Sequence, residues 1–274
     1  MTAGEVTEYM ESLRNDEQRR VLMRFFKTGP GEYGEGDEFL GLKVPQTREI
    51  VKAVAKDFPS DEVPALLMSK WHEVRLCGLL ILVDIFGRLS IKRLTNDVEA
   101  IKKRDAILAM YLHYAERANN WDLVDLSAPK ILGAWLLLPT TLGNGREYKQ
   151  QALDGLAKSG NLWRQRMSIV CTWKTSQQGD PSWCQRYAKM HLHHPHDLMH
   201  KAVGWMLREM GKRCGMDLLR DFLRQHVHEM PRTTLRYAIE KMSEEERQTW
   251  MRIPEAHNFQ KNVVKLNEPP LIID

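Results

Sequence analysis

The sequence has little of what marks a secreted, disulfide-bonded or membrane-spanning protein. Its four cysteines (Cys77, Cys171, Cys184 and Cys214) are far apart and form no CxxC pair, so a reduced intracellular protein is the simpler interpretation. The longest apolar run, residues 131–138, contains a glycine and is too short to cross a bilayer. The first ten residues lack a basic stretch followed by an apolar one, so we expect no signal peptide and a cytoplasmic protein without a membrane partner.

Segments with the alternating polar and apolar residues of a β-strand are also lacking. Nearly every long segment instead has apolar residues three and four positions apart, as in Glu5–Phe26 and residues 122–137, which is the spacing of helices. The breaks between these segments fall at glycine or proline. The pattern predicts an all-α fold, in which short helix pairs stack as a right-handed α-solenoid of irregular HEAT-like repeats with a concave face.

The same pattern predicts a single domain over residues 1–252. A glycine-rich segment, residues 28–44, interrupts the helices as one long irregular loop, and residues 253–274 have no clear pattern and are interpreted as a C-terminal tail. The net charge of +4 is small, and it would favour a polyanion only if the basic residues gathered on one face.

Five helical segments place a charged residue before an apolar stretch at a comparable position. These residues are Arg75, Asp125, Arg166, Lys201 and Arg236, separated by 50, 41, 35 and 35 residues. The two equal steps indicate a repeating unit, so we expect the five to share one position in successive repeats. A row of cations in a concave groove would bind the phosphates of a nucleic acid, and the single carboxylate in that row, Asp125, is the candidate for catalysis.

Trp121 and Asp125 stand four residues apart in a segment that Asn119 or Asn120 can cap, so the two side chains share one helix face. An indole beside a carboxylate suits a cation, or a positive charge that develops on a sugar ring. Alternatively, Trp121 is a core residue and Asp125 is a structural partner of Arg166.

Trp205 follows Lys201 by four residues and repeats the aromatic–charge spacing. Gly204 lies between them, which favours close packing of helices or close approach of a ligand. Arg164 and Arg208 add positive charge to the expected groove. The plainer alternatives are a helix–helix core contact for the tryptophan and solvated surface charges for the basic residues.

Gly29, Gly31 and Gly34 match the GxGxxG pattern of dinucleotide sites by letter. No strand is expected before them and no helix directly after them, so we interpret them as part of a surface loop. Such a loop can still fold over a ligand, with Tyr33 near its tip.

Five histidines between His191 and His200 suggest a zinc site. Pro195 separates them into two groups and no further ligand is evident, so a turn and a helix start explain them equally well. We expect neither a metal ion nor an organic cofactor.

Several segments between about residue 20 and about residue 245 together resemble the AlkD-like family of DNA alkylation repair proteins. They occur in the same order as in that family. The segments are residues 39–45 (FLGLKVP), 120–125 (NWDLVD), 162–166 (LWRQR), 201–209 (KAVGWMLRE) and 231–239 (PRTTLRYAI). Any one of them alone would not be specific.

The resemblance implies a fold of HEAT-like repeats that grips duplex DNA, and a monofunctional glycosylase that removes cationic alkylpurines such as 7-methylguanine and 3-methyladenine. It implies Asp125 as the catalytic carboxylate, Trp121 and Trp205 beside the sugar of the damaged nucleotide, and Arg166 on the DNA backbone. The implied partner is double-stranded DNA with alkylated purines, bound by a monomer associated with the nucleoid. The sequence itself indicates no deep pocket for an extruded base.

One position departs from the family pattern, which has a tyrosine in the N-terminal helix where this chain has Phe25. The hydroxyl is absent there, unless Tyr33 supplies one from the loop. Two other functions suit a helical-repeat protein: binding of damaged or branched DNA without catalysis, and a scaffold for other proteins.

Overall fold

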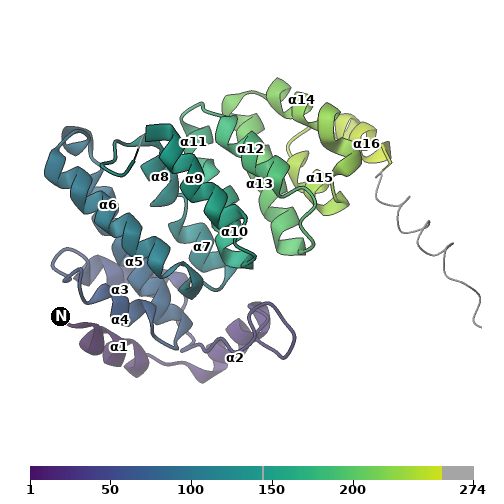
Figure 1. Cartoon of the computed structure of the whole chain (residues 1–274). Coiled ribbons are helices and arrows are strands. Elements are labelled where there is room, and N and C mark those ends of the chain that lie inside the picture. Colours follow the sequence, from purple (N-terminus) through teal and green to yellow (C-terminus); the bar gives the residue numbers. More distant parts are fainter. Residues whose placement is uncertain (144, 255–274) are drawn as a thin grey trace, which may run out of the picture. The chain divides into compact units, whose positions relative to one another are not determined.

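The computed structural model describes residues 1–143 and 145–254, and this part of the chain is built of helices (Figure 1). Within it, the one β feature is an isolated bridge between Glu38 and Trp71. The all-α prediction is therefore confirmed. The right-handed solenoid, its concave groove and the single domain over residues 1–252 stay predictions. Of the predicted tail, residues 255–274 lie outside the described residues.

The chain divides into two compact units, Met1–Lys174 and Thr175–Asp274. The helices of the first unit are α1 (Ala3–Ser12), α2 (Asp16–Phe25), α3 (Val44–Val54), α4 (Val63–Leu67), α5 (His72–Leu89), η1 (Lys92–Leu94), α6 (Val98–His113), η2 (Ala115–Arg117), α7 (Trp121–Ser127), α8 (Leu132–Leu137), α9 (Gly145–Ala157) and α10 (Leu162–Val170). Helix α11 (Thr172–Gln177) crosses the boundary. The second unit holds α12 (Ser182–Met190), α13 (Asp197–Cys214), α14 (Met216–His226), η3 (Val227–Glu229), α15 (Arg232–Ala238) and α16 (Glu244–Arg252).

Helix α5 is the central helix of the first unit. Between Leu76 and Leu82 it is buried on all sides, and a helix of that kind is stable only when other elements cover it. Helices α3, α4, α6 and α7 all pack against it. Among the described helices, α5 included, none combines the length and the apolar composition that a bilayer crossing requires. The first turn of α5 holds His72 and Arg75, which are therefore also buried.

Two predicted helices are interrupted in the structure. The single helix predicted for Glu5–Phe26 is wrong, because α1 stops at Ser12 and Asn15 starts α2 by accepting a hydrogen bond from the Gln18 backbone N–H (2.9 Å). Residues 122–137 likewise form α7 and α8 with a turn between them. At the first break, an asparagine side chain that bonds to the nearby backbone competes with a continuous helix. At the second, Pro129 lies two residues after the end of α7, and proline interrupts a helix.

The glycine-rich segment over residues 28–44 is irregular, as predicted, but its end is firmly attached to α5. The Glu73 carboxylate accepts hydrogen bonds from three successive backbone N–H groups, those of Leu40, Gly41 and Leu42 (2.9, 2.9 and 3.1 Å). Gly41 has φ +93°, and a Cβ atom there would lie 2.1 Å from the backbone of the turn between α1 and α2. Only glycine fits this position.

In the second unit, the long helix α13 packs against α12, α14 and α15. Gly204 permits the contact with α15, since a Cβ atom there would lie 2.4 Å from the Thr234 carbonyl oxygen and 2.5 Å from the Tyr237 Cβ atom. Of the two explanations for Gly204, close helix packing is the one seen in the structure.

Candidate active site

Two asparagine caps position the charged residues at the centre of the site. The side chains of Asn120 and Asn161 cap α7 and α10, accepting hydrogen bonds from the first backbone N–H groups of each helix at 2.9 to 3.1 Å. Asp125 follows Asn120 by five residues, and Arg166 follows Asn161 by five residues. Helices α7 and α10 pack together, and this packing brings the two side chains into contact.

Asp125 and Arg166 form a two-point ion pair. The guanidinium Nε donates to Oδ1 at 2.9 Å and Nη2 donates to Oδ2 at 2.8 Å. The side chains of Arg166 and Asp125 are only 6% and 16% exposed. Burial raises the pKa of Asp125, the charge and hydrogen bonds of Arg166 lower it, and the negative charge of Asp122 raises it, with a net rise. Asp125 is therefore a carboxylate with a raised pKa, held in one orientation by an arginine.

An apolar pocket of about 420 Å³ opens beside Asp125 and Trp121. This size is within the range of small-ligand sites. The sequence indicated no such pocket, because its walls come from four separate stretches of the chain. The pocket is lined by Leu22, Phe25, Phe26, Phe39, Leu42, Lys43, Val44, Pro45, His72, Glu73, Leu76, Trp121, Asp122, Asp125 and Leu126.

Aromatic rings form one wall of this pocket. Phe26 is buried and stacks on Trp121, with ring centroids 5.3 Å apart and an angle of 25° between the rings. Phe25 is 60% exposed and meets Trp121 edge-on, at 5.9 Å and 71°. Trp121 is thus half-buried and fixed by its neighbours, with Phe25 covering it next to solvent.

A chain of four charged side chains, which we call the buried array, lies behind the pocket: Arg75, Asp37, His72 and Asp122. His72 places Nδ1 2.8 Å from an Asp37 oxygen and Nε2 2.9 Å from an Asp122 oxygen. Because both ring nitrogens face carboxylates, both must carry protons. Arg75 donates to the other Asp37 oxygen, and all four side chains are at most 6% exposed. The array ties α7 to α5 and to the glycine-rich segment.

The charges of the buried array stabilise one another. Burial alone would lower the pKa of His72, but the carboxylates of Asp122 and Asp37 raise that pKa to about 9. Burial alone would raise the pKa of Asp37, but hydrogen bonds and charges from His72 and Arg75 lower it. With His72 protonated, two cations balance two carboxylates.

The placement of Arg75 argues against its predicted role in DNA binding. Its guanidinium is occupied by Asp37 and by the backbone carbonyl oxygens of Ser69, Lys70 and Arg117, and its side chain is 2% exposed. Helices pack around α5, so a position expected to face a groove is inside the unit. We assign Arg75 a structural role in the buried array.

The other predicted residues of the first unit lie at the surface or half-buried. Arg164 is half-exposed, with Nη1 3.4 Å from a Glu116 oxygen. Tyr33 packs edge-on against Trp163, with ring centroids 6.1 Å apart, and is not among the residues that line the pocket. The position that Phe25 occupies at the pocket therefore receives no hydroxyl from Tyr33.

The second unit carries the remaining predicted residues. Trp205 is half-buried in α13. Lys201 pairs with the aspartate one turn before it at 2.7 Å, and Arg208 pairs with Glu240. Arg236 is exposed, and no carboxylate of the described chain pairs with it. That these residues join Asp125 in one site stays a prediction.

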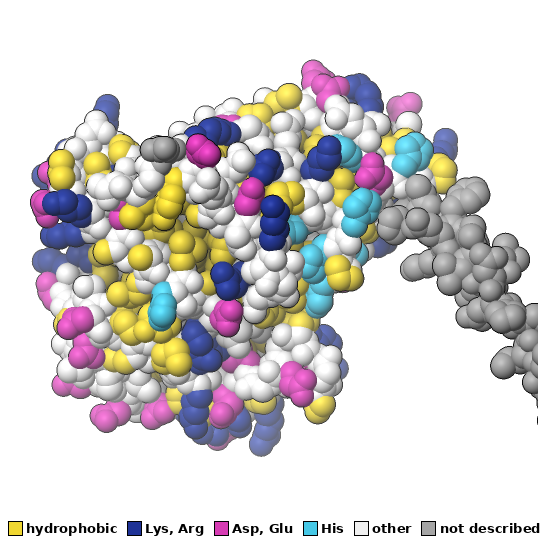
Figure 2. All heavy atoms as spheres, viewed as in Figure 1, with side chains coloured by type: hydrophobic (Ala, Val, Ile, Leu, Met, Phe, Trp, Pro, Cys, Tyr) yellow, Lys and Arg dark blue, Asp and Glu magenta, His cyan; other side chains and the backbone are white. Residues whose placement is uncertain are grey.

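Histidines gather on the surface of the second unit (cyan in Figure 2). Across residues 1–143 and 145–254, no group of three His, Cys, Asp or Glu side chains could hold a metal ion. The histidines instead make local hydrogen bonds: His196 Nδ1 accepts from the Leu198 N–H (3.1 Å), and His200 Nε2 lies 2.6 Å from the His194 carbonyl oxygen. They shape the start of α13.

Three residues that build this region were not predicted from the sequence: His72, Asp37 and Phe26. All three are more than fifty residues from Asp125, and none belongs to a motif of fixed spacing. One signal was present. His72 and Arg75 are one turn apart at the start of a largely apolar segment, and cations buried there need carboxylate partners.

The chain matches the family model described as DNA alkylation repair enzyme over residues 6–242. Among solved structures it resembles one described as a predicted DNA alkylation repair enzyme from Enterococcus faecalis, with a TM-score of 0.61 and 14% sequence identity. That match covers 84% of this chain and 97% of the other. At this identity the likeness concerns the fold. No curated protein sequence matches the chain.

Proposed function

The chain belongs to the DNA alkylation repair enzyme family, and on that premise we propose that it is a monofunctional DNA glycosylase. Its substrates would be cationic N7- and N3-alkylated purines in duplex DNA, such as 7-methylguanine and 3-methyladenine, and the bond cleaved would be the N-glycosidic bond. The observation that carries the proposal is the Asp125 carboxylate, held by Arg166 beside Trp121 at an apolar pocket.

The chemistry needs little acid catalysis. Alkylation at N7 or N3 gives the purine a positive charge, so the base leaves readily. As the C1′–N bond breaks, the positive charge passes to the sugar, and an anion beside the sugar lowers the energy of this oxocarbenium-like transition state. Asp125 supplies that anion. Water then attacks C1′, and the carboxylate orients the water and accepts its proton.

The surroundings of Asp125 strengthen this effect. The aromatic and aliphatic pocket lining excludes water, and charges attract more strongly at lower dielectric. The face of Trp121 favours a cationic sugar. We propose that Arg166 orients Asp125 and also contacts the DNA backbone near the lesion, and that Arg164 makes a further backbone contact.

The second unit would supply a second indole, Trp205, beside the sugar. We propose Arg236, Lys201 and Arg208 as its phosphate contacts. Arg236 is the strongest of these candidates, because Lys201 and Arg208 already have carboxylate partners.

A second candidate function is binding of damaged or branched DNA without catalysis. One observation favours it: both oxygens of Asp125 accept hydrogen bonds from Arg166, an arrangement also seen in purely structural ion pairs.

Base release from methylated duplex DNA separates the two candidates. The protein is incubated with the DNA, and released bases are identified by chromatography while the strands are checked for breaks. We expect free 7-methylguanine and 3-methyladenine, with abasic sites and no strand cleavage. Retention of damaged DNA without released base would favour the second candidate, and a protein that retains no DNA at low salt would exclude both.

A further inference from the structure

Four exposed cations that line one groove of the first unit have no acidic partner. Arg48, Lys52 and Lys56 are spaced four residues apart along α3 and the turn after it, so they point from one face. Lys130, just after α7, is exposed as well. Within the described part of the chain, no carboxylate lies within ion-pair distance of any of the four.

Some other exposed cations of the unit are paired with carboxylates. Lys102 pairs with Glu99 at 2.9 Å, and Arg14 pairs with Asp16 at 2.8 Å. Unpaired like charges that are close together repel one another, and burial together with the charge of Arg48 lowers the pKa of Lys130. An anion that binds among them would relieve this repulsion.

These cations border a groove of about 350 Å³ with an apolar floor. One carboxylate lines it, Asp84, and that carboxylate pairs with Arg88 at 2.8 Å. The remaining charged lining is positive: Arg48, Lys52, Lys56 and Lys130.

The groove lies about one helical turn away from the pocket beside Asp125. In three stretches of the chain, one residue lines the pocket and the residue four positions later lines the groove. These pairs are Val44 and Arg48, Leu76 and Leu80, and Leu126 and Lys130. The groove and the pocket are therefore neighbouring sites of the first unit.

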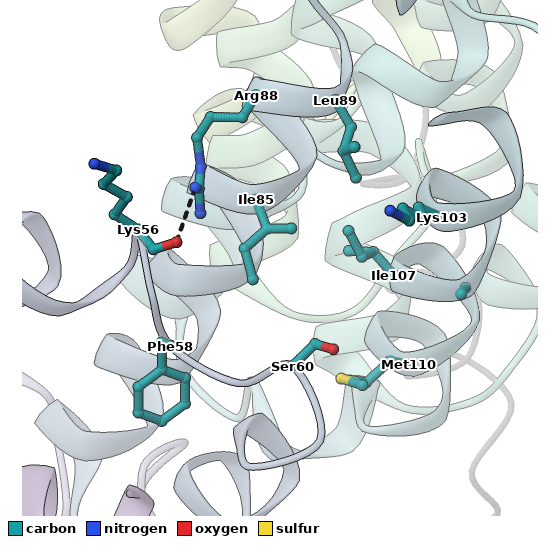
Figure 3. A pocket seen from close by; sticks show the side chains of 10 residues that line it. Lys56, Phe58, Ser60, Ile85, Arg88, Leu89, Lys103, Ile107 and Met110 are labelled. Carbon is teal, nitrogen blue, oxygen red and sulfur yellow. Dashed lines mark hydrogen bonds between the residues drawn. The ribbon is translucent and has the colours of Figure 1, made fainter. Parts of the chain in front are cut away.

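A further pocket, of about 430 Å³, borders the groove. It shares Lys56 and Arg88 with the groove and adds Lys103 from α6. Figure 3 shows Lys56 and Arg88 on one side of this pocket and Lys103 on the other, with apolar side chains such as Ile85 and Ile107 between them. We call Arg48, Lys52, Lys56, Lys103 and Lys130 the cationic track.

We propose that the cationic track binds the sugar–phosphate backbone of duplex DNA on one flank of the lesion. The choice of duplex DNA as the ligand rests on the proposed function. Eight residues separate Arg48 from Lys56, which is about 12 Å at a helical rise of about 1.5 Å per residue. One strand of B-DNA presents a phosphate roughly every 3.4 Å along its axis, so the track spans roughly three to four phosphates. The contacts would be independent of base sequence and would fix where the duplex lies relative to Asp125.

The test compares two triple variants that remove the same charge. The track variant is Lys52→Ala, Lys56→Ala and Lys130→Ala. The control removes three exposed lysine or arginine side chains that already have surface partners: Lys102→Ala, Arg224→Ala and Lys241→Ala. Thermal melting of both variants verifies that they are folded.

Affinity for an undamaged duplex is measured over a range of salt concentrations. The slope of log K against log salt should become shallower by about 0.9 for each phosphate that the variant no longer neutralises, and thus by about 2 to 3 in the track variant. Its affinity at low salt should fall by about 10- to 100-fold, and the control should stay within about twofold of the unmodified protein. Equal decreases in the two variants, or an unchanged salt slope, would overturn the proposal. Since undamaged DNA is used, failure of base release would reject the proposed function without affecting this result.

Discussion

Helix α7 carries two aspartates within one turn, and the protein surrounds them differently. Asp122 belongs to the buried array, where the imidazolium of His72 neutralises it away from solvent. Asp125 stands at a pocket, is partly exposed, and is held by Arg166 from another helix. The same residue type on the same helix is therefore expected to stabilise the fold at one position and to perform chemistry at the other.

The difference lies in what covers each carboxylate. Asp122 also lines the pocket, but its side chain is only 6% exposed and one of its oxygens is bonded by His72 of α5. Beside Asp125 the chain leaves an opening large enough for part of a nucleotide. Breaking the buried array should therefore lower stability, and altering the pocket should change base release while the fold persists.

The largest expected effect is on stability, from His72→Gln. The change removes a buried cation between Asp37 and Asp122, which leaves Asp122 without a counterion and Asp37 with Arg75 alone, and this costs about 3–5 kcal/mol of unfolding free energy. Urea unfolding measures the decrease. The exposed His113→Gln is the matched control and should change stability by less than about 0.5 kcal/mol. Similar values for the two variants would contradict a structural role for the array.

The buried array also predicts how stability depends on pH. The pKa of His72 is raised to about 9 from an ordinary value of 6.5, so between these values the folded protein holds a proton that the unfolded chain releases. The contribution of His72 is fully present below about pH 6.5 and is lost as pH rises through about 9. Thermal melting from pH 6 to pH 10 should show a steeper decline for the unmodified protein than for His72→Gln. Parallel curves would show that His72 is not the protonated centre.

A smaller effect is expected at the rim of the pocket, from Phe25. Because its ring is 60% exposed, Phe25→Ala should lower the free energy of unfolding by no more than about 1.5 kcal/mol. The edge-on packing against Trp121 that this change removes is worth about 0.5–1.5 kcal/mol, so base release should slow by about two- to tenfold. Phe25→Tyr keeps the ring and should stay within about twofold. If Phe25→Ala released base at the rate of the unmodified protein, the Phe25 ring would have no role in the site.

The fold class could be predicted from the sequence, but only some of the residues that form the site could be. Helical spacing is local information, so the all-α class and the shared face of Trp121 and Asp125 could be read directly. The pairing of Asp125 with Arg166 was one of two open interpretations. Whether neighbouring helices cover a given position is not local information. Arg75 and Arg166 have similar positions in the pattern of basic residues and both are buried, yet Arg75 bonds to Asp37 and three backbone carbonyl oxygens, whereas Arg166 bonds to the carboxylate at the pocket.

The pocket and the cationic track were not predicted for the same reason. The pocket joins α2, the segment up to the start of α3, the start of α5 and α7, which no motif of fixed spacing connects. The four-residue spacing of Arg48, Lys52 and Lys56 is visible in the sequence, but whether acidic side chains neutralise these cations depends on tertiary neighbours. Long-range contacts, in both cases, decide whether a charge is structural or available to a ligand.

The most direct test of the central claim is the single-turnover rate of 7-methylguanine release by Asp125→Asn, measured beside Asp122→Asn at a temperature where both are folded. DNA affinity is measured on the same preparations. Removal of the anion at the sugar should slow Asp125→Asn by at least about 100-fold while DNA affinity is kept or slightly raised, and Asp122→Asn should release base at close to the unmodified rate. Release by Asp125→Asn at the rate of the unmodified protein would contradict the assignment of Asp125 as the catalytic carboxylate.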